Sequence, residues 1–187
     1  MIYTVPNLIS DDVCRELIRY YEDFPQNRRK NEDQEQELFH GKTMNPFAID
    51  DPNLKQALEV IKQRITVMVA KYYHCKEVYL DYWDLVRWDE QDYMSMHADN
   101  CKDDLTPHDY CGWRSHSAIL YLNQDFEGGE TVFRDMNQNY RAETGKALIF
   151  PASFDYTHGV NAVQSGKRYT LALWFTESPA HCVKGWE

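Results

Sequence analysis

The apolar positions along the chain change their period once, from a helical repeat before Lys76 to an alternating repeat after it. Residues 10–24 carry an apolar stripe at helical spacing, with Ser10 as a good N-cap and Pro25 as a stop. A second apolar stripe begins at Asp51-Pro52, where proline suits the first helical turn, and should run to about Tyr72. Two helices are therefore predicted in the N-terminal third.

The alternating part of the chain divides into short segments separated by clusters of Gly, Asn, Asp and Pro. The expected strands are 77–88, 93–98, 115–122, 131–133, 147–150, 158–163 and 168–175. Two helices followed by such strands predict an α+β protein with a jelly-roll core (a double-stranded β-helix) and N-terminal helices packed on one side. No internal repeat or linker is visible, so we expect one domain over residues 1–187, with helical support in 1–76 and the core in 77–178.

The composition narrows the choice of partners. A net charge of −10 argues against a nucleic-acid partner and favours peptide or small-molecule substrates. The N-terminus has no basic segment, and no stretch is long and apolar enough to span a bilayer, so we expect a cytoplasmic protein without a membrane partner. The five cysteines are odd in number and lack C-x-x-C spacing, which is typical of free thiols in a reducing compartment. The sequence leaves the oligomeric state open.

Residues 26–37 form an almost wholly polar and charged segment directly after Pro25. One interpretation is a solvated connection between the first helix and the rest of the chain. The other is a flap that orders over bound substrate. The composition of the segment does not choose between them.

Candidate metal ligands lie on one of the expected strands. His97 and Asp99 are two positions apart, so in an extended strand both side chains project from the same face. An imidazole beside a carboxylate is two thirds of the two-histidine, one-carboxylate set that binds non-haem Fe(II), although His-x-Asp alone is a weak signal. A later expected strand supplies His158, and Arg168 opens the last strand. The other histidines have no partner at metal-ligand spacing and are interpreted as surface or core residues.

Five motifs, taken together, carry a resemblance to a known family. They are His97-x-Asp99, Gly128-Gly-Glu-Thr131, Gly145-x-Ala-x-x-Phe-Pro151, His158-x-Val160 and Gly166-x-Arg168-Tyr169. Their order and spacing resemble those of the Fe(II)- and 2-oxoglutarate-dependent dioxygenases, and within them the prolyl 4-hydroxylase type, over residues 78–178. The resemblance implies an enzyme that uses Fe(II), 2-oxoglutarate and O₂, with ascorbate as a stimulant. It also implies that 2-oxoglutarate is converted to succinate while a peptide or protein, most naturally at proline, is hydroxylated.

The resemblance assigns roles to individual residues. It implies that His97, Asp99 and His158 are the iron ligands, and that the planar guanidinium of Arg168 grips the distal carboxylate of 2-oxoglutarate. Lys167 is the alternative, but strand alternation turns these neighbours to opposite faces, so only one can point inward. Further contacts to 2-oxoglutarate are expected from Thr131, Tyr121 and Trp88. Trp174 matches a tryptophan that lies near the iron site in this family, and Arg114 and Asn100 border the expected cleft, so contacts to the substrate are expected from these three residues.

Two departures from the family pattern leave the substrate open. Trp88 stands where a tyrosine is usual, and its indole N–H can donate a hydrogen bond but not accept one. Met94 stands where a second tyrosine is expected, and the displaced Tyr93 faces the wrong way unless a bulge intervenes. The alternatives are an oxygenase that acts on a small molecule or a nucleic-acid base, and a non-catalytic jelly-roll module that binds sugar or a structural zinc.

Overall fold

The computed structural model describes residues 1–29, 39–136 and 138–185. Its helices are α1 (Asp11–Asp23) and α2 (Pro52–Tyr73). Its strands are β1 (Tyr3–Val5), β2 (Lys42–Met44), β3 (Tyr79–Trp88), β4 (Met94–His97), β5 (Arg114–Tyr121), β6 (Glu127–Gly128), β7 (Thr131–Phe133), β8 (Gln138–Tyr140), β9 (Ala147–Pro151), β10 (His158–Val160), β11 (Val163–Ser165) and β12 (Arg168–Thr176). Most of the polar segment 26–37 lies outside the described residues, so the choice between a connection and a flap stays open.

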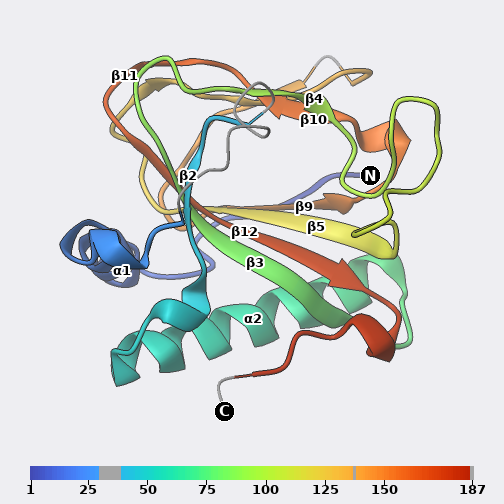
Figure 1. Ribbon diagram of the computed structural model, residues 1–187, viewed down its shortest axis with the longest axis horizontal. Helices are drawn as coiled ribbons and strands as arrows, with labels where there is room; N and C mark the ends of the chain where they lie inside the picture. Colours follow the sequence, from blue (N-terminus) through green and yellow to red (C-terminus); the bar gives the residue numbers. More distant parts are fainter. Residues whose placement is uncertain (30–38, 137, 186–187) are drawn as a thin grey trace.

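The strands form two main sheets that pack against each other. The large sheet has the order β1-β9-β5-β12-β3-β2, the small sheet has the order β4-β10-β7-β8, and β11 pairs with β6. Neighbouring strands in the described sheets are antiparallel. Leu148 and Phe150 of the large sheet pack with Phe133 of the small sheet, which closes the space between them. The predicted α+β jelly roll is confirmed (Figure 1).

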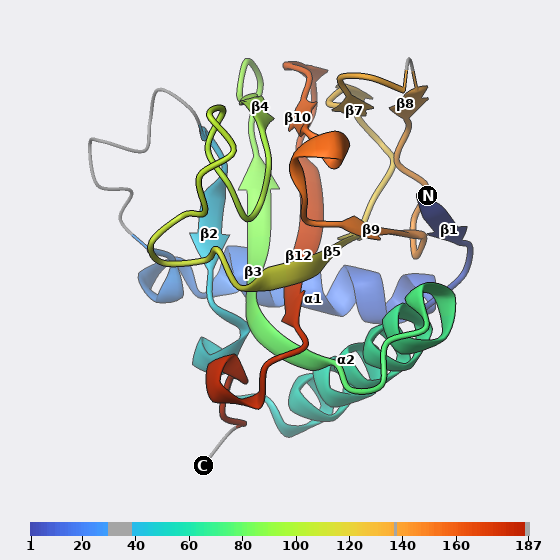
Figure 2. The ribbon, with the colours of Figure 1, turned by 90° about the vertical axis from the view of Figure 1, so that its right-hand side faces the viewer.

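The two helices cover the other face of the large sheet, as predicted (Figures 1 and 2). Helix α2 begins where the Asp51 carboxylate accepts hydrogen bonds from the N–H groups of Asn53 and Leu54, both at 2.9 Å. Its apolar stripe then packs with α1 and the sheet in one core cluster. Within the described residues, no helix combines the length and the apolar character needed to cross a membrane.

Alternation along the strands of the large sheet sends side chains to two different interiors. On β5, Ala118 and Leu120 belong to the core under the helices, whereas Tyr121 packs between the two sheets. Both faces are covered, which explains why these strands appear in the sequence as nearly continuous apolar runs. The same alternation turns the polar side chains of β5 to opposite faces, since Ser117 contacts Asp99 and His116 packs against Tyr73 of α2.

The structure differs from the predicted elements in its shortest strands and in the division of one expected strand. Strands β1 and β2, at the two edges of the large sheet, and strands β6 and β8 were not expected, because segments of two or three residues show no period in the sequence. The equally short β7 was expected because a glycine-marked turn precedes it. The segment expected as one strand over 158–163 is divided into β10 and β11. The reason is a change of partner, since β10 pairs with β4 and β7 whereas β11 pairs with β6.

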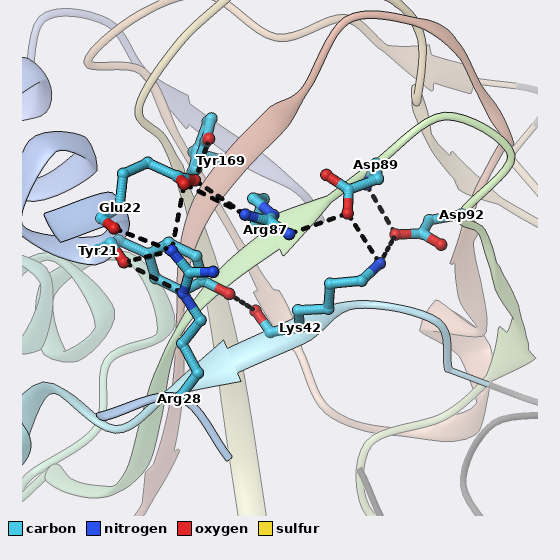
Figure 3. Close-up of polar contacts among 8 residues, drawn as sticks. All are labelled: Tyr21, Glu22, Arg28, Lys42, Arg87, Asp89, Asp92 and Tyr169. Atoms are coloured by element: carbon cyan, nitrogen blue, oxygen red, sulfur yellow. Dashed lines mark hydrogen bonds and ion pairs between the residues drawn. The ribbon is translucent and has the colours of Figure 1, made fainter. Parts of the chain in front are cut away.

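A network of charged side chains fastens α1 to the large sheet (Figure 3). Glu22, near the end of α1, accepts a hydrogen bond of 2.6 Å from the Tyr169 hydroxyl of β12 and one of 3.1 Å from Arg87 of β3. The network extends through Arg28, Lys42, Asp89 and Asp92. Burial alone would raise the pKa of Glu22, but the contacts with Tyr169 and Arg87 together hold that pKa below its ordinary value.

Candidate metal centre

Two histidines from neighbouring strands of the small sheet lie side by side. His158 of β10 pairs with His97 of β4, and the centroids of their rings are 4.4 Å apart. The Nδ1 atom of each ring lies 3.0 Å from a main-chain carbonyl oxygen two residues earlier, that of Ser95 or Tyr156. A carbonyl oxygen only accepts, so Nδ1 carries the proton and Nε2 presents its lone pair. This is the orientation of histidine metal ligands.

Asp99 follows the end of β4 in a bend, not in the extended strand expected from the sequence, and its carboxylate lies close to the Nε2 atoms of both histidines. Its Oδ1 is 3.5 Å from Nε2 of His97, and its Oδ2 is 3.8 Å from Nε2 of His158. One possible ligand atom from each of the three residues lies within 4.8 Å of the others. The structure therefore brings together the three residues that the sequence analysis selected as a metal-binding set.

A bulge in β4 contributes to this placement. Between the two paired positions, β4 advances by three positions, from His97 back to Met94, while β10 advances by only two, from His158 to Val160. An extra residue on one strand changes which face the following side chains occupy. Tyr93, which is displaced by one residue from the tyrosine position of the family, directly precedes this bulged strand.

The Asp99 carboxylate is held by donors from the large sheet. Ser117 of β5 donates to Oδ2 at 2.6 Å, and the indole Nε1–H of Trp174 on β12 donates to Oδ1 at 2.8 Å. The main-chain N–H of Asp99 donates to the carbonyl of Ala152 at 3.1 Å. Both carboxylate oxygens are thus oriented by fixed donors, while their remaining lone pairs point toward the histidines.

The protonation states suit cation binding. Burial alone would raise the pKa of Asp99, but the neighbouring His158 and His97 and the hydrogen bond from Ser117 together hold it well below its usual range. Burial and the neighbouring His97 lower the pKa of His158 to about 4. Burial also acts to lower the pKa of His97, but its contact with Asp99 outweighs this effect and raises the pKa. The set therefore offers a carboxylate and, at neutral pH, an uncharged imidazole at His158.

This donor set fits Fe(II). Two imidazoles and one carboxylate are the facial triad of non-haem iron oxygenases, and three protein ligands leave positions open on one side of the ion. The Asp99 and His158 side chains are 5% and 7% exposed, whereas that of His97 is 27% exposed. Solvent and substrate therefore reach the metal site from the side of His97.

A buried positive charge lies in the same space between the sheets. Arg168 is 1% exposed, and among the described residues no carboxylate contacts its guanidinium. It donates to the hydroxyls of Thr131 at 3.2 Å and Thr170 at 3.5 Å, while its Nε has no hydrogen-bond partner. Since a buried charge is costly without a counter-ion, this arrangement indicates a site for an anionic ligand. Lys167, the alternative considered from the sequence, is exposed.

The neighbours of Arg168 include the other residues expected to contact the same ligand. The Tyr121 hydroxyl lies 2.7 Å from the Thr131 hydroxyl, and the guanidinium carbon is 5.4 Å from the ring centres of both Tyr121 and Trp88. The Trp88 indole N–H is buried and has no hydrogen-bond partner in the described chain. Gly129 has a φ of +63°, and a Cβ there would approach the Arg168 side chain to 3.1 Å, which accounts for glycine at this position.

The residues expected at the substrate form a group at the edge of the triad. Trp174 donates to Asp99 and lies under Arg114, whose guanidinium carbon is 4.6 Å from an indole ring centre. Arg114 also forms an ion pair of 2.9 Å with Asp81. Asn100 donates to the main-chain carbonyl of Arg114 at 3.1 Å. Sequence reasoning selected neither Ser117 nor Asp81, because no motif links them to the residues that they contact.

Comparison with known proteins identifies the class. The profile of the 2OG-Fe(II) oxygenase superfamily matches residues 83–176, which include the triad and Arg168. The chain belongs to this superfamily, whose members are dioxygenases that use Fe(II) and 2-oxoglutarate.

Within the superfamily, several of the similar proteins are prolyl hydroxylases. Human prolyl 3-hydroxylase 2 is 39% identical over 99 residues, which cover 46% of this chain and 14% of that protein. Mouse prolyl 3-hydroxylase 3 is 31% identical over 156 residues, which cover 72% of this chain and 21% of that protein. The chain thus spans only a small part of the length of these curated relatives.

Solved structures of prolyl hydroxylases share the fold. The viral collagen prolyl hydroxylase of Paramecium bursaria Chlorella virus-1, in its complex with 2-oxoglutarate, has a TM-score of 0.68 and 17% identity, covering 93% of this chain and 94% of that chain. A Pseudomonas putida prolyl 4-hydroxylase has a TM-score of 0.67 and 16% identity, covering 94% and 91%. A Trichoplax adhaerens prolyl hydroxylase in complex with a peptide fragment of the hypoxia inducible factor oxygen degradation domain has a TM-score of 0.69 and 14% identity, covering 94% and 83%.

Proposed function

We propose that this chain is an Fe(II)- and 2-oxoglutarate-dependent dioxygenase that hydroxylates proline in a peptide or protein. The observation that carries the proposal is the combination of the His97–Asp99–His158 triad with the buried charge of Arg168, which contacts no carboxylate among the described residues. A structural zinc site would use the triad but would have no need for a buried cation beside it. A dioxygenase needs the triad to bind the metal and the buried cation to bind the dicarboxylic acid.

His97, Asp99 and His158 would hold the iron. When bound, Fe(II) with 2-oxoglutarate and O₂ supplies the oxidative decarboxylation to succinate and CO₂ that accompanies hydroxylation of the substrate. The role of the chain is to orient the ligands: Ser117 and Trp174 fix the plane of the Asp99 carboxylate, and main-chain carbonyls fix the two imidazoles.

Arg168 would bind the distal carboxylate of 2-oxoglutarate. Its guanidinium can form two parallel charge-assisted hydrogen bonds with a carboxylate, and the hydroxyls of Thr131 and Tyr121 lie in position to add further ones. Thr131 pairs with Val160, two residues along β10 from His158. Two residues of strand correspond to about 7 Å, which is a suitable span for a five-carbon diacid.

A peptide is the substrate class that the surroundings of the triad favour. The exposed side of the triad is that of His97, whose side chain is 27% exposed. The half-buried indole of Trp174, which donates to Asp99, lies at the edge of the same site. An aromatic surface beside the metal site suits the pyrrolidine ring of proline. The prolyl hydroxylases among the similar proteins, one of them in a peptide complex, support the same choice.

The first test is turnover of 2-oxoglutarate without substrate. The chain, loaded with Fe(II) under air, should convert 2-oxoglutarate slowly to succinate, and ascorbate should sustain the reaction. His97→Ala should lose this activity because the metal site loses one of three ligands. Lys167→Ala is the matched control and should behave as the unmodified chain. Succinate production that is equal in His97→Ala would refute the assignment of the metal site.

The second test identifies the substrate. Proline-containing peptides incubated with the enzyme, Fe(II), 2-oxoglutarate and ascorbate should gain one oxygen in mass spectrometry. Amino-acid analysis after hydrolysis then distinguishes 3-hydroxyproline from 4-hydroxyproline. Succinate production that is stimulated by a small molecule or a methylated base, and not by any proline peptide, would replace the peptide assignment by one of the two alternatives.

A reducing compartment such as the cytoplasm belongs to the proposal, because the five cysteines show no disulfide-type spacing.

A further inference from the structure

A second group of metal-ligand side chains lies away from the triad. Cys75, His116 and Glu177 each offer one ligand atom, and these atoms lie within 4.8 Å of one another. Cys75 follows the end of α2, His116 lies near the start of β5, and Glu177 follows the end of β12. These three element ends meet on the same side of the molecule in Figure 1. Sequence patterns did not reveal the group, because its members come from three distant segments.

The second group lies on the opposite face of the large sheet from the triad. Ala118 and Leu120 of β5 belong to the core under the helices, and His116 has the same parity along the strand. Consistent with this, the His116 ring packs against Tyr73 of α2, with ring centres 4.3 Å apart. Ser117, which donates to Asp99, points the other way. The two groups are therefore separated by the thickness of one sheet and share no residue.

His116 is prepared to act as a ligand. Its residue surface is only 7% exposed, and burial lowers its pKa to about 4, so the imidazole is uncharged at neutral pH. Its Nδ1 lies 3.0 Å from the hydroxyl of Ser115, a contact that fixes the ring. Among the described residues Nε2 has no hydrogen-bond partner. A neutral histidine with one nitrogen anchored and the other available is the usual form of a metal-bound histidine.

Cys75 and Glu177 supply two groups that are anionic as ligands. Burial raises the pKa of the Cys75 thiol, and the nearby Glu177 carboxylate raises it further. A raised pKa argues against an activated cysteine nucleophile, because nucleophilic thiols need a lowered one. A divalent cation between the thiolate and the carboxylate would remove their mutual repulsion by replacing the thiol proton.

We propose that Cys75, His116 and Glu177 form a second metal site, and that its ion is Zn²⁺. Thiolate, imidazole and carboxylate together are ligands of zinc, whereas the sulfur-free triad suits Fe(II). Tetrahedral zinc with these ligands requires ligand atoms about 3.5 Å apart, and the three ligand atoms lie within 4.8 Å of one another before any ion is bound. The ion ties the end of α2 to the ends of β5 and β12, which carry the Ser117 and Trp174 donors to Asp99.

The test uses Co²⁺ as a spectroscopic substitute for Zn²⁺ in the full chain stripped of metal. A cobalt–thiolate bond gives a charge-transfer band in the near ultraviolet, and the triad cannot produce it because it holds no sulfur. The unmodified chain and His97→Ala should both show the band. Cys75→Ser should lose it, and Glu177→Gln should raise the Co²⁺ dissociation constant about tenfold or more. Cys182→Ser, which removes an exposed thiol outside the group, is the matched control and should keep the band.

Two further outcomes separate this proposal from the dioxygenase assignment. Zn²⁺ should displace Co²⁺ from the band-forming site even in His97→Ala, where 2-oxoglutarate turnover is lost. It should also raise the unfolding temperature of His97→Ala more than that of the Cys75→Ser, His97→Ala double variant. Absence of the band in the unmodified chain, or its persistence in Cys75→Ser, would overturn the second metal site and leave the dioxygenase assignment untouched.

Discussion

Replacing Arg168 with methionine should stabilise the ligand-free protein and abolish its response to 2-oxoglutarate. The guanidinium is fully buried without a carboxylate partner in the described chain, and such a charge costs several kcal/mol even after relaxation. Its hydrogen bonds to Thr131 and Thr170 recover about 1 kcal/mol each. Methionine has a similar length and no charge, so the net gain should be about 2 kcal/mol. For a chain of this size, that is roughly 4–8 °C in unfolding temperature.

Addition of 2-oxoglutarate should reverse this order of stability. At a concentration one hundred times its dissociation constant, a ligand stabilises the folded state by about 2.7 kcal/mol. The unmodified chain should show this increase in unfolding temperature. Arg168→Met should not, because the distal carboxylate of 2-oxoglutarate would have no positive charge to bind. The measurement is thermal unfolding with and without 2-oxoglutarate, with Mn²⁺ in place of Fe(II) to prevent turnover.

Lys167→Met is the matched control for this experiment. Lys167 is the exposed neighbour of Arg168, so its replacement should change the free energy of unfolding by less than about 0.5 kcal/mol and preserve the ligand shift. The reasoning is refuted if Arg168→Met is less stable than the unmodified chain without ligand and still responds fully to 2-oxoglutarate. In that case Arg168 would be a structural residue whose charge is compensated in another way.

Three other substitutions test separate parts of the structure. Trp174→Phe removes the hydrogen bond to Asp99 and should weaken Mn²⁺ binding about 10- to 100-fold in a titration. The stability of the metal-free chain should change little. Unchanged Mn²⁺ affinity would show that Asp99 needs no indole donor. Glu22→Gln should cost about 1–2 kcal/mol of unfolding free energy at pH 7. Because the folded-state pKa of Glu22 is lowered, its contribution is present above the ordinary glutamate pKa and is lost as the pH falls, so the two proteins should converge in acid. His116→Phe keeps a ring against α2 but removes a group with a folded-state pKa of about 4. The unfolded chain takes up that proton below about pH 6.5, so between pH 6.5 and 4 the unmodified chain should lose up to about 3 kcal/mol more than the variant in chelator-treated samples, and equal pH slopes would contradict the burial argument.

The sequence predicts the elements whose pattern is long enough to show a period. Helix α2 and strand β12 bury a continuous set of side chains, and their expected ranges differ from the observed ones by a residue at an end. Strands β1 and β2 escape prediction because they are defined by pairing with distant strands, whereas the equally short β7 is marked by the glycine turn before it. The division of 158–163 into β10 and β11 also depends on partners that lie elsewhere in the chain.

In the candidate site, too, local patterns can be predicted from the sequence, whereas contacts between distant segments cannot. His97 and Asp99 can be selected from their two-residue spacing, and His158 and Arg168 from motifs of a known family. The contacts of Ser117 and Trp174 with Asp99 join a loop residue to two other strands, and no local pattern encodes that proximity. Trp174 illustrates this limit: the resemblance implies a position near the iron site, and only the structure shows its hydrogen bond to Asp99, while its contact with the substrate stays a prediction.

The triad draws its three side chains and their supports from opposite halves of the barrel. The histidines belong to the small sheet, while the donors that orient Asp99 belong to the large one. A chain whose two sheets have not yet packed would lack the assembled binding set, so it would hold iron poorly. Newly made or damaged copies would then carry little of an ion that can generate harmful oxidants, and loading with metal would report that the barrel has closed correctly.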